Sequence, residues 1–501
     1  MTLVKPAEEK STDLEDVLDK LSIYKSYHLR IAILIFLAFA SNTVYCSNFI
    51  FVAESVNYTC IKYSSDSNST SDCEEWQYDN PDSFVAEFQL ANQEWKRTLI
   101  GTVHSLGYMV GLLIVGPMSD RLGRRNTLVV TGVLGGVFGV ARSFSHWYWL
   151  YLAFEFLEGA IGDSCSPAYI LITEVVSTSQ RIKFVLMCSI GYAFGGLVIA
   201  LTAWTIPYWR TFLQVIYTPA LLLFFYKYLL DESPRWLLIK GNKDEAVKIL
   251  EKAAKKNDQK LDRNVVEKLS CQNNESKDFL KTVKSTFSSN VLRVRFFVCL
   301  VWWTTSTFVS YGLTINSVSL QGNKYLNYAL LSAVEVPGLF VVSYILIYCK
   351  RKLPLICCFF AAAILCVSQP FVPLGMPWLS ILFYMAGKLM SSFYFNITYL
   401  YTSELFPTYT RNSMHALCSS LGRIGSIISP QTPLLMQYWF GLPSLTFGLA
   451  SLFAGLVTFM VPDISNDSLP DTVREAEELG KSKKSMKSLE IDYIKSDITR
   501  F

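Results

Sequence analysis

Charged residues are scarce in this sequence of 501 residues. Asp, Glu, Lys and Arg make up 17% of it, against about 25% in an ordinary soluble globular domain. The 45 basic residues exceed the 41 acidic residues by only four, and they lie between apolar blocks, not in the single stripe that would follow a nucleic acid. The composition therefore argues against a soluble enzyme and against a nucleic-acid-binding protein.

Motifs for catalysis are also missing. The sequence has no nucleotide-binding P-loop, no cluster of metal-ligating residues and no nucleophile beside a base. These absences argue against primary active transport and against an enzyme. We therefore expect neither a cofactor nor a metal.

Apolar and aromatic residues are abundant instead. Hydrophobic residues make up 51% of the chain and aromatic residues 14%, and Trp and Tyr recur at the edges of apolar runs, as they do at membrane interfaces. A helix needs about 20 residues to cross roughly 30 Å of hydrocarbon, and about twelve runs reach this length. Each must be helical, because hydrocarbon offers no partner to an unpaired backbone group. The predicted fold class is an all-α membrane protein with 12 transmembrane helices.

The predicted spans form two sets of six around a polar insert. They cover approximately residues 31–51, 99–118, 127–144, 147–176, 183–204, 211–230, 296–316, 325–348, 355–371, 378–403, 416–439 and 445–461. The predicted domains are an N-terminal segment (1–30), an N-terminal half (31–230), an insert (231–295), a C-terminal half (296–461) and a tail (462–501). Within the insert, residues 244–256 have the pattern of a short amphipathic helix that lies against the bundle.

The basic residues of the connections predict the orientation. Arg121, Arg124 and Arg125 follow the second span, and residues 350–352 follow the eighth, and such connections stay in the cytoplasm. Segment 54–96 faces the other way and holds nine acids against two lysines. We expect this segment to be extracellular and both termini to be cytoplasmic.

The predicted extracellular segment carries two features of an oxidising, glycosylating compartment. Cys60 and Cys73 lie there, and we expect a disulfide between them. Asn57 and Asn68 begin glycosylation sequons in the same segment, so both are predicted to carry glycans.

A repeat relates the two halves. Glu174 is followed seven residues later by Arg181, and Glu404 by Arg411, so the second pair lies 230 residues after the first (404 − 174 and 411 − 181). Asp120 plus the same offset is Lys350 in the second basic connection. Two six-helix halves arising by duplication explain this pattern, and such transporters bind substrate near the midplane where the halves meet.

Several motifs also carry a family resemblance. Residues 107–111 (Gly-Tyr-Met-Val-Gly) and 116–125 (Gly-Pro-Met-Ser-Asp-Arg-Leu-Gly-Arg-Arg) resemble the region between helices two and three of the major facilitator superfamily. Residues 231–237, 401–412 and 425–430 resemble motifs of the organic cation, organic anion and carnitine transporter family. The resemblance implies the major facilitator fold over residues 13–463.

The resemblance also implies a function. A member of this family would be a secondary transporter that moves carnitine-like zwitterions, organic anions or organic cations across the plasma membrane by alternating access. Its partners would be the small organic ion, the lipid bilayer and a coupling ion or counter-substrate, with no nucleic acid; the sequence leaves the oligomeric state open. The alternative is a ligand sensor or receptor built on a transporter scaffold.

Charged motif residues at the cytoplasmic helix ends are predicted to gate the cycle. Ion pairs there can form in one conformation and break in another, and a network of them competes with the few kcal/mol that separate the states. The alternative is simple anchoring by positive charge. The predicted gating residues are Asp120, Arg124, Glu174, Arg181, Glu232, Arg235, Glu404 and Arg411.

Charges within the predicted spans are candidates for substrate or ion contact, because a charge inside a membrane is costly. They are Glu158, Asp163, Glu335, Lys388 and Arg423. An Arg fork holds a carboxylate, and a carboxylate holds an ammonium group. Arg423 with Glu335 would thus suit a zwitterion or an organic anion, whereas pairing with neighbouring helices is the structural alternative.

Uncharged side chains complete the predicted site. The resemblance places Tyr311 and Asn42 at the substrate cavity, and Tyr401 could line it and attract an ammonium group. Packing is the alternative for each of them. His104 could titrate near neutral pH, but we expect it to be a satisfied packing histidine. Glu155, like Glu158, stands where the family usually carries a different residue type.

Overall fold

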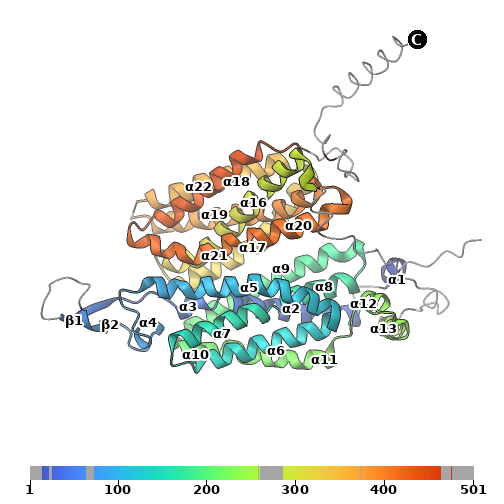
Figure 1. Cartoon of the computed structure of the whole chain (residues 1–501), viewed down its shortest axis with the longest axis horizontal. Coiled ribbons are helices and arrows are strands. Elements are labelled where there is room, and N and C mark those ends of the chain that lie inside the picture. The colour runs from blue at the N-terminus through green and yellow to red at the C-terminus, as the bar shows by residue number, and fades with distance from the viewer. Residues whose placement is uncertain are drawn as a thin grey trace, which may run out of the picture. The chain divides into compact units, whose positions relative to one another are not determined.

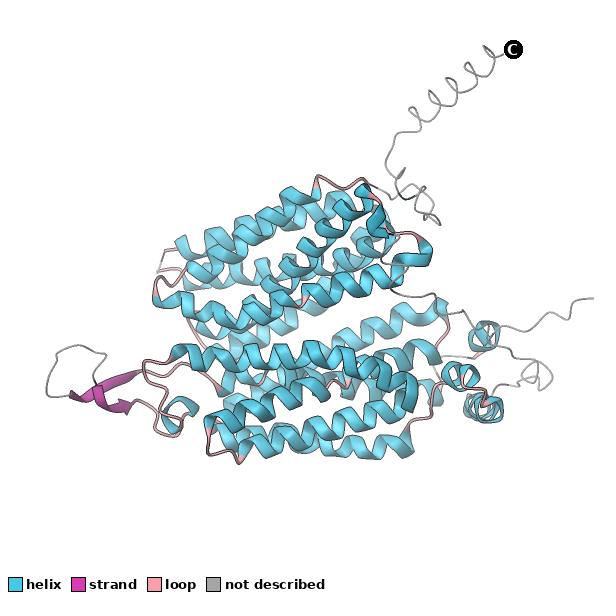
Figure 2. Cartoon of the chain, viewed as in Figure 1, coloured by secondary structure: helices cyan, strands magenta, loops and turns pink. Residues whose placement is uncertain are grey.

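The computed structural model describes residues 14–21, 25–63, 73–257, 259, 286–373, 375–463 and 476. Most of these residues are helical, and the two strands among them form one small hairpin (Figure 2). The chain divides into two compact units. The first comprises Met1–Glu275 and Ser317–Val336, and the second comprises Ser276–Asn316 and Pro337–Phe501.

The first unit contains the helices of the six predicted N-terminal spans (Figure 1). Three of the spans are built from more than one helical segment. In chain order the segments are α2 (Ser26–Ser47) with α3 (Phe49–Val52), α5 (Glu94–Leu122), α6 (Arg124–Ser143), α7 (Tyr148–Ile161) with α8 (Cys165–Val175), α9 (Arg181–Thr205) after the 3-10 turn η2 (Thr178–Gln180), and α10 (Trp209–Tyr217) with η3 (Thr218–Phe225) and α11 (Tyr226–Leu229).

The second unit contains the helices of the predicted C-terminal spans. They are α16 (Asn290–Asn316), which is followed by η4 (Ser317–Ser319) of the first unit, α17 (Lys324–Tyr348), α18 (Lys352–Ser368) with η5 (Gln369–Phe371), α19 (Pro377–Leu405), α20 (Thr408–Gly422) with α21 (Ile424–Ile428) and η6 (Ser429–Gln437), and α22 (Leu442–Thr458). Helix α17 belongs to both units, because the division between them falls between Val336 and Pro337.

The helices have the character of membrane spans. Among the described residues, seven helices are long and apolar enough to cross a membrane. Large apolar side chains such as Leu113, Trp204 and Ile347 are exposed, as is expected where lipid replaces water. Each unit therefore presents apolar side chains on the outside of its bundle as well as in its core.

The predicted fourth span is broken in the middle. Helix α7 ends at Ile161 and α8 begins at Cys165. Asp163 lies in the break, where its Oδ1 accepts hydrogen bonds from the backbone N–H groups of Cys165 (3.0 Å) and Ser166 (3.2 Å). A carboxylate that accepts the first free amides of a helix stabilises that helix start.

Helices α5 and α7 pack with their backbones in contact. A Cβ atom on Gly107 would lie 2.5 Å from the carbonyl oxygen of Phe156, and one on Gly111 would lie 2.5 Å from that of Ala160. Two glycines four residues apart lie on one face of a helix. The Gly-Tyr-Met-Val-Gly motif thus provides the surface on which α7 rests.

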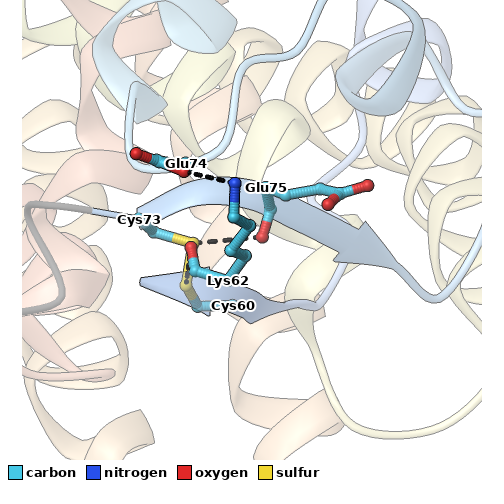
Figure 3. Close-up of a disulfide and its surroundings, with 5 residues drawn as sticks. All are labelled: Cys60, Lys62, Cys73, Glu74 and Glu75. Atoms are coloured by element: carbon cyan, nitrogen blue, oxygen red, sulfur yellow. Dashed lines mark hydrogen bonds and ion pairs between the residues drawn. A yellow bond between two sulfur atoms is a disulfide. The ribbon is translucent and has the colours of Figure 1, made fainter. Parts of the chain in front are cut away.

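A disulfide-linked hairpin precedes α5. Strands β1 (Tyr58–Tyr63) and β2 (Cys73–Tyr78) pair antiparallel, and Cys60 and Cys73 form the predicted disulfide between them (Figure 3). Lys62 and Glu74 add an ion pair of 2.8 Å across the hairpin. The short helix α4 (Phe84–Glu87) then returns the chain to the bundle.

Three short helices pack at the opposite end of the first unit. They are α1 (Leu14–Lys20), α12 (Pro234–Ile239) and α13 (Lys243–Lys256). Helix α13 is the predicted amphipathic helix, and it buries Ala246, Leu250 and Ala253. Helix α1 buries Leu14, Val17 and Leu18 in the same apolar cluster.

Candidate functional site

Arg124 is the centre of an ionic network at the junction of α5, α6 and α8. Its Nε lies 3.2 Å from both carboxylate oxygens of Glu174, and its Nη2 lies 3.0 Å from Oε1. Its Nη1 donates to Asp120 Oδ1 at 2.9 Å and to the Ser119 carbonyl at 3.0 Å. The structure therefore brings three of the predicted gating residues together on one guanidinium group.

Glu232 completes this junction from the segment after α11. Its Oε1 accepts hydrogen bonds from the backbone N–H groups of Arg124 (2.8 Å) and Arg125 (3.1 Å), so it caps the start of α6. Gly123, between α5 and α6, has φ +96°, and a Cβ there would lie 2.4 Å from Glu232 Oε2. Only glycine suits both the backbone conformation and the space.

Arg181 and Arg235 make a second ionic group with Glu15 of α1. Arg235 Nη2 lies 2.7 Å from Glu15 Oε2, and Arg181 Nη2 lies 3.9 Å from it. The Thr178 backbone N–H also donates to Glu15. Glu174 and Arg181, which recur as a motif pair, are thus paired with other residues and not with each other.

A similar ion pair lies in the second unit. Arg351, just before α18, places its Nε 3.4 Å from Glu404 Oε1 near the end of α19. Arg411 lies in the first turn of α20, and its backbone N–H donates to the Pro407 carbonyl at 2.8 Å. Glu404 is the repeat partner of Glu174, so each unit pairs the equivalent glutamate with an arginine at the start of a helix.

Arg423 occupies a break in the eleventh predicted span. Helix α20 ends at Gly422 and α21 begins at Ile424. Cβ atoms on Gly422 and Gly425 would lie 2.6 Å from Trp303 Cβ and 2.3 Å from the Thr304 carbonyl. The two glycines therefore let the broken helix lie directly on α16, with Arg423 between them.

Aromatic residues surround this part of the second unit. Arg423 Nη1 lies 3.5 Å from the Tyr311 hydroxyl of α16. The rings of Trp303 and Tyr399 have centroids 5.1 Å apart, and His415 lies 4.5 Å from the Tyr399 ring. The structure thus brings together Arg423 and Tyr311, which are both predicted substrate contacts.

Two other predicted charges lie on α17 and α19. Glu335 is half-buried, two residues before Pro337 and in the part of α17 that belongs to the first unit. Lys388 is buried, and its Nζ donates to the Ser310 carbonyl (3.0 Å), the Ser310 hydroxyl (3.1 Å) and the Thr314 hydroxyl (2.9 Å). The contacts of Lys388 join α19 to α16, which favours a structural role.

Three more predicted site residues are each buried inside their own unit, Tyr401 in the second and Asp163 and Asn42 in the first. The Tyr401 ring stacks on Trp302 with centroids 5.2 Å apart, and its hydroxyl donates to the Pro462 carbonyl. Asp163 caps α8 as described above. These contacts favour structural roles for both. Asn42 is buried in α2, where its Nδ2 lies 3.7 Å from Cys46 Sγ.

The first unit contains a buried ionic cluster that joins α5, α6 and α7. His104 Nδ1 lies 3.0 Å from Glu155 Oε1 and 3.2 Å from Glu158 Oε2. Arg142 Nη1 contacts the other oxygen of Glu155. The exposed fractions of these four residues are 5% for His104 and 0–1% for the others.

Sequence reasoning found only Glu158 as a site residue in this cluster. His104 is buried, as expected of a satisfied packing histidine, and it contacts two carboxylates. The sequence does not predict Arg142 as an intramembrane charge, because it lies two residues before the end of its apolar run. The pattern that could have predicted its ion pair is a basic residue inside one predicted span and two acids one turn apart in the next span.

The structure describes one of the two predicted glycosylation sites. Asn57 is exposed just before β1, where a glycan would have room. Asn68 lies outside the described residues. A cavity at this end of the first unit is lined by Phe51, Glu54, Trp209 and Tyr325, among others, and contains none of the predicted substrate residues.

Comparison with known sequences gives consistent matches. The family model described as "Sugar (and other) transporter" matches residues 29–474. Solute carrier family 22 member 1 of Oryctolagus cuniculus is 32% identical over 426 residues, which cover 82% of this chain and 75% of that protein. The organic cation transporter protein of Drosophila melanogaster is 32% identical over 431 residues, or 83% of this chain and 78% of its own length.

Comparison with solved structures gives the same fold. The xylose transporter XylE from E. coli, in a partially occluded inward-open conformation, aligns with a TM-score of 0.62 and 18% identity. The alignment covers 88% of this chain and all of that one. At this identity the likeness concerns the fold alone.

Proposed function

This chain belongs to solute carrier family 22 within the major facilitator superfamily, and from that premise we propose that it moves small organic ions across the plasma membrane by alternating access. The major facilitator fold of 12 helices and the family predicted from the sequence motifs are both confirmed by the comparisons. The family consists of membrane transporters, and no observation favours a ligand sensor.

The observation that carries the proposed substrate class is the position of Arg423. It lies at the junction of α20 and α21 and beside the Tyr311 hydroxyl, and a charge within a membrane span is a candidate for substrate contact. A guanidinium group offers a fixed fork of donors to a carboxylate. We therefore assign Arg423 and Tyr311 to the carboxylate end of an organic anion or zwitterion.

Glu335 is the proposed partner for a positive group on the substrate. Its position beside Pro337 places a half-buried carboxylate in a helix that both units share. A carboxylate of this kind would hold an ammonium group. A carnitine-like zwitterion, which carries an ammonium group, is a substrate class that Glu335 would serve.

The proposed gates are two arginine–glutamate pairs, one in each unit, whose glutamates are related by the repeat. Arg124 with Glu174 and Arg351 with Glu404 each join helix ends that come from separate spans. Partly buried pairs of this kind bias a conformational equilibrium because each holds its helices in one arrangement. We propose both on the cytoplasmic side, together with both chain termini.

Uptake by injected oocytes tests the proposal. We expect uptake of radiolabelled carnitine above the level of water-injected oocytes, and less uptake of tetraethylammonium and of p-aminohippurate. In the Arg423→Asp variant, uptake of the two carboxylates should fall at least about tenfold, which corresponds to one lost charge-assisted interaction of roughly 1.5–3 kcal/mol.

Surface abundance and a conservative variant complete the test. Arg423→Lys keeps the charge but loses the fork, so it should show an intermediate loss for the carboxylates at normal surface abundance. An equal loss for carnitine, p-aminohippurate and tetraethylammonium at normal abundance would contradict the role in charge selection. Absence of uptake for all three in the wild type would count against the proposed substrate class.

A further inference from the structure

The buried cluster of His104, Arg142, Glu155 and Glu158 lacks one positive charge. With a neutral imidazole, one guanidinium faces two carboxylates, so the cluster carries a net charge of −1. All four side chains are buried inside the first unit, where an uncompensated charge costs several kcal/mol. The cluster becomes neutral when it binds one unit of positive charge.

We propose that this charge is a proton, held on His104 between Glu155 and Glu158, and that the transport cycle takes it up and releases it. The geometry supports the imidazolium form. His104 Nδ1 lies 3.0 and 3.2 Å from oxygens of both carboxylates, so this nitrogen carries a hydrogen that faces them. The added proton then goes to the other ring nitrogen, Nε2, which is buried, and Cys46 lies beside the imidazole.

Arg142 argues against a metal ion in the same place. The ligand atoms of His104, Glu155 and Glu158 lie within 4.8 Å of one another, but Arg142 Nη1 is already in contact with Glu155 Oε2. A divalent ion bound among these atoms would lie next to a guanidinium group that has nowhere to move. Arg142 is fixed on its other side by Asn48 Oδ1 (2.8 Å) and the Tyr217 hydroxyl (3.0 Å).

The other titratable groups near the cluster do not supply the missing charge. Tyrosine and cysteine are neutral near pH 7, so burial leaves their charge at zero. They come from α2, α7 and α10, and are Tyr45, Cys46, Tyr151 and Tyr217.

The cluster lies where a proton could influence the cycle. It joins α5, α6 and α7, and Asn42 of α2, a predicted substrate contact, lies one turn from Cys46 beside the imidazole. The coupling to transport rests on the proposed function, whereas the protonation of His104 does not. The two statements therefore need separate measurements.

The protonation is measured by nuclear magnetic resonance of the full chain in nanodiscs with 15N-labelled histidine. The chain has only four histidines, so a variant with His28, His146 and His415 replaced by Gln leaves the His104 signal alone. We expect an imidazolium signal near pH 7. In the same background Glu158→Gln removes one negative charge, and His104 should then be neutral at that pH.

Glu74→Gln is the matched control, because it makes the same substitution in the exposed hairpin. It should leave the His104 signal charged. A neutral His104 in the parent chain at pH 6, or a charged one in the Glu158→Gln variant, would overturn the proton site.

The coupling is measured in proteoliposomes that contain the pH indicator pyranine. Uptake of the substrate found in the oocyte panel should change the internal pH, and His104→Gln should take up substrate while the pH signal falls to that of protein-free liposomes. His146→Gln, in an exposed loop, should behave as the wild type. Substrate uptake by the wild type without a pH change would overturn the coupling, while a wild type that transports nothing would contradict the proposed function and leave the resonance result standing.

Discussion

The guanidinium group of Arg124 binds both carboxylate oxygens of Glu174 across 50 residues of sequence, with distances of 3.0 and 3.2 Å. The two side chains are only 10% and 14% exposed. A bidentate pair that is shielded from water is stronger than the exposed pairs expected at helix ends. It joins the start of α6 to the end of α8, so any motion between these helices must break it.

The first prediction concerns turnover. Arg124→Ala removes the pair with Glu174 and should lower the maximal rate of uptake at least about tenfold, which corresponds to about 1.4 kcal/mol. The substrate concentration for half-maximal uptake should change by less than about twofold. Uptake kinetics normalised to surface abundance check this. Arg125→Ala is the matched control, because the Arg125 side chain hydrogen-bonds the neighbouring Asn126. A change in affinity alone would contradict a gating role.

The second prediction concerns Gly123. Gly123→Ala should destabilise the protein by about 1–3 kcal/mol, because alanine disfavours a positive φ and its Cβ would displace the Glu232 carboxylate from the start of α6. Thermal unfolding in detergent measures the loss. Gly116→Ala, seven residues earlier in the same motif, has no atom within 4 Å of the added Cβ and should be at least as stable as the wild type. Equal stability of both variants would show that Glu232 can move freely.

The third prediction concerns the hairpin. Treatment with peptide N-glycosidase should increase the gel mobility of the wild type, and Asn57→Gln should reduce that shift, because Asn57 is exposed beside β1. The Asn57→Gln, Asn68→Gln double variant should show no shift. An unglycosylated wild type made in insect or mammalian cells would contradict the extracellular position of segment 54–96.

The fourth prediction concerns the pH dependence of α1. Burial alone would raise the pKa of the Glu15 carboxyl, but the hydrogen bonds from Thr178 and the charges of Arg235 and Arg181 outweigh it and lower that pKa. The stabilisation is therefore complete above the ordinary pKa of glutamate and is lost as the pH falls through the lowered pKa of the docked helix.

Hydrogen exchange of residues 14–20 checks this prediction. Exchange corrected for its intrinsic rate should be slower at pH 7 than at pH 3.5 in the wild type, and the two should be nearly equal in Glu15→Gln. Glu74→Gln should keep the wild-type difference. A wild-type α1 with the same protection at both pH values would show that the apolar contacts of Leu14, Val17 and Leu18 hold it alone.

The sequence was sufficient for the spans and the family, because both depend on local features. Length and hydropathy determine where a helix can cross a membrane, and the motifs occupy short runs of residues. The interruptions at Asp163 and Arg423 were not predicted, because an apolar run shows no sign of where its helix will be interrupted. The disulfide was predictable, since Cys60 and Cys73 share one short segment.

The pairing of charges needed the structure. Glu174 and Arg181 are seven residues apart, yet Glu174 binds Arg124 and Arg181 binds Glu15. The sequence shows which residues carry charge at the helix ends but not which ends are neighbours. The same limit hid the contact of Arg142 with Glu155, since the orientation of α6 around its own axis decides whether that arginine faces the bundle or the lipid.

The contact of α5 with α7 has a mechanical consequence. At Gly107 and Gly111 the two backbones touch without intervening side chains, so there is no rotamer change through which one helix could slide along the other. The two helices should therefore move as one rigid body during the cycle. Side chains that bridge the two helices, such as His104 and Glu158, would then keep a fixed separation. A movement at one end of the helix pair would displace the other end without a local rearrangement of side chains.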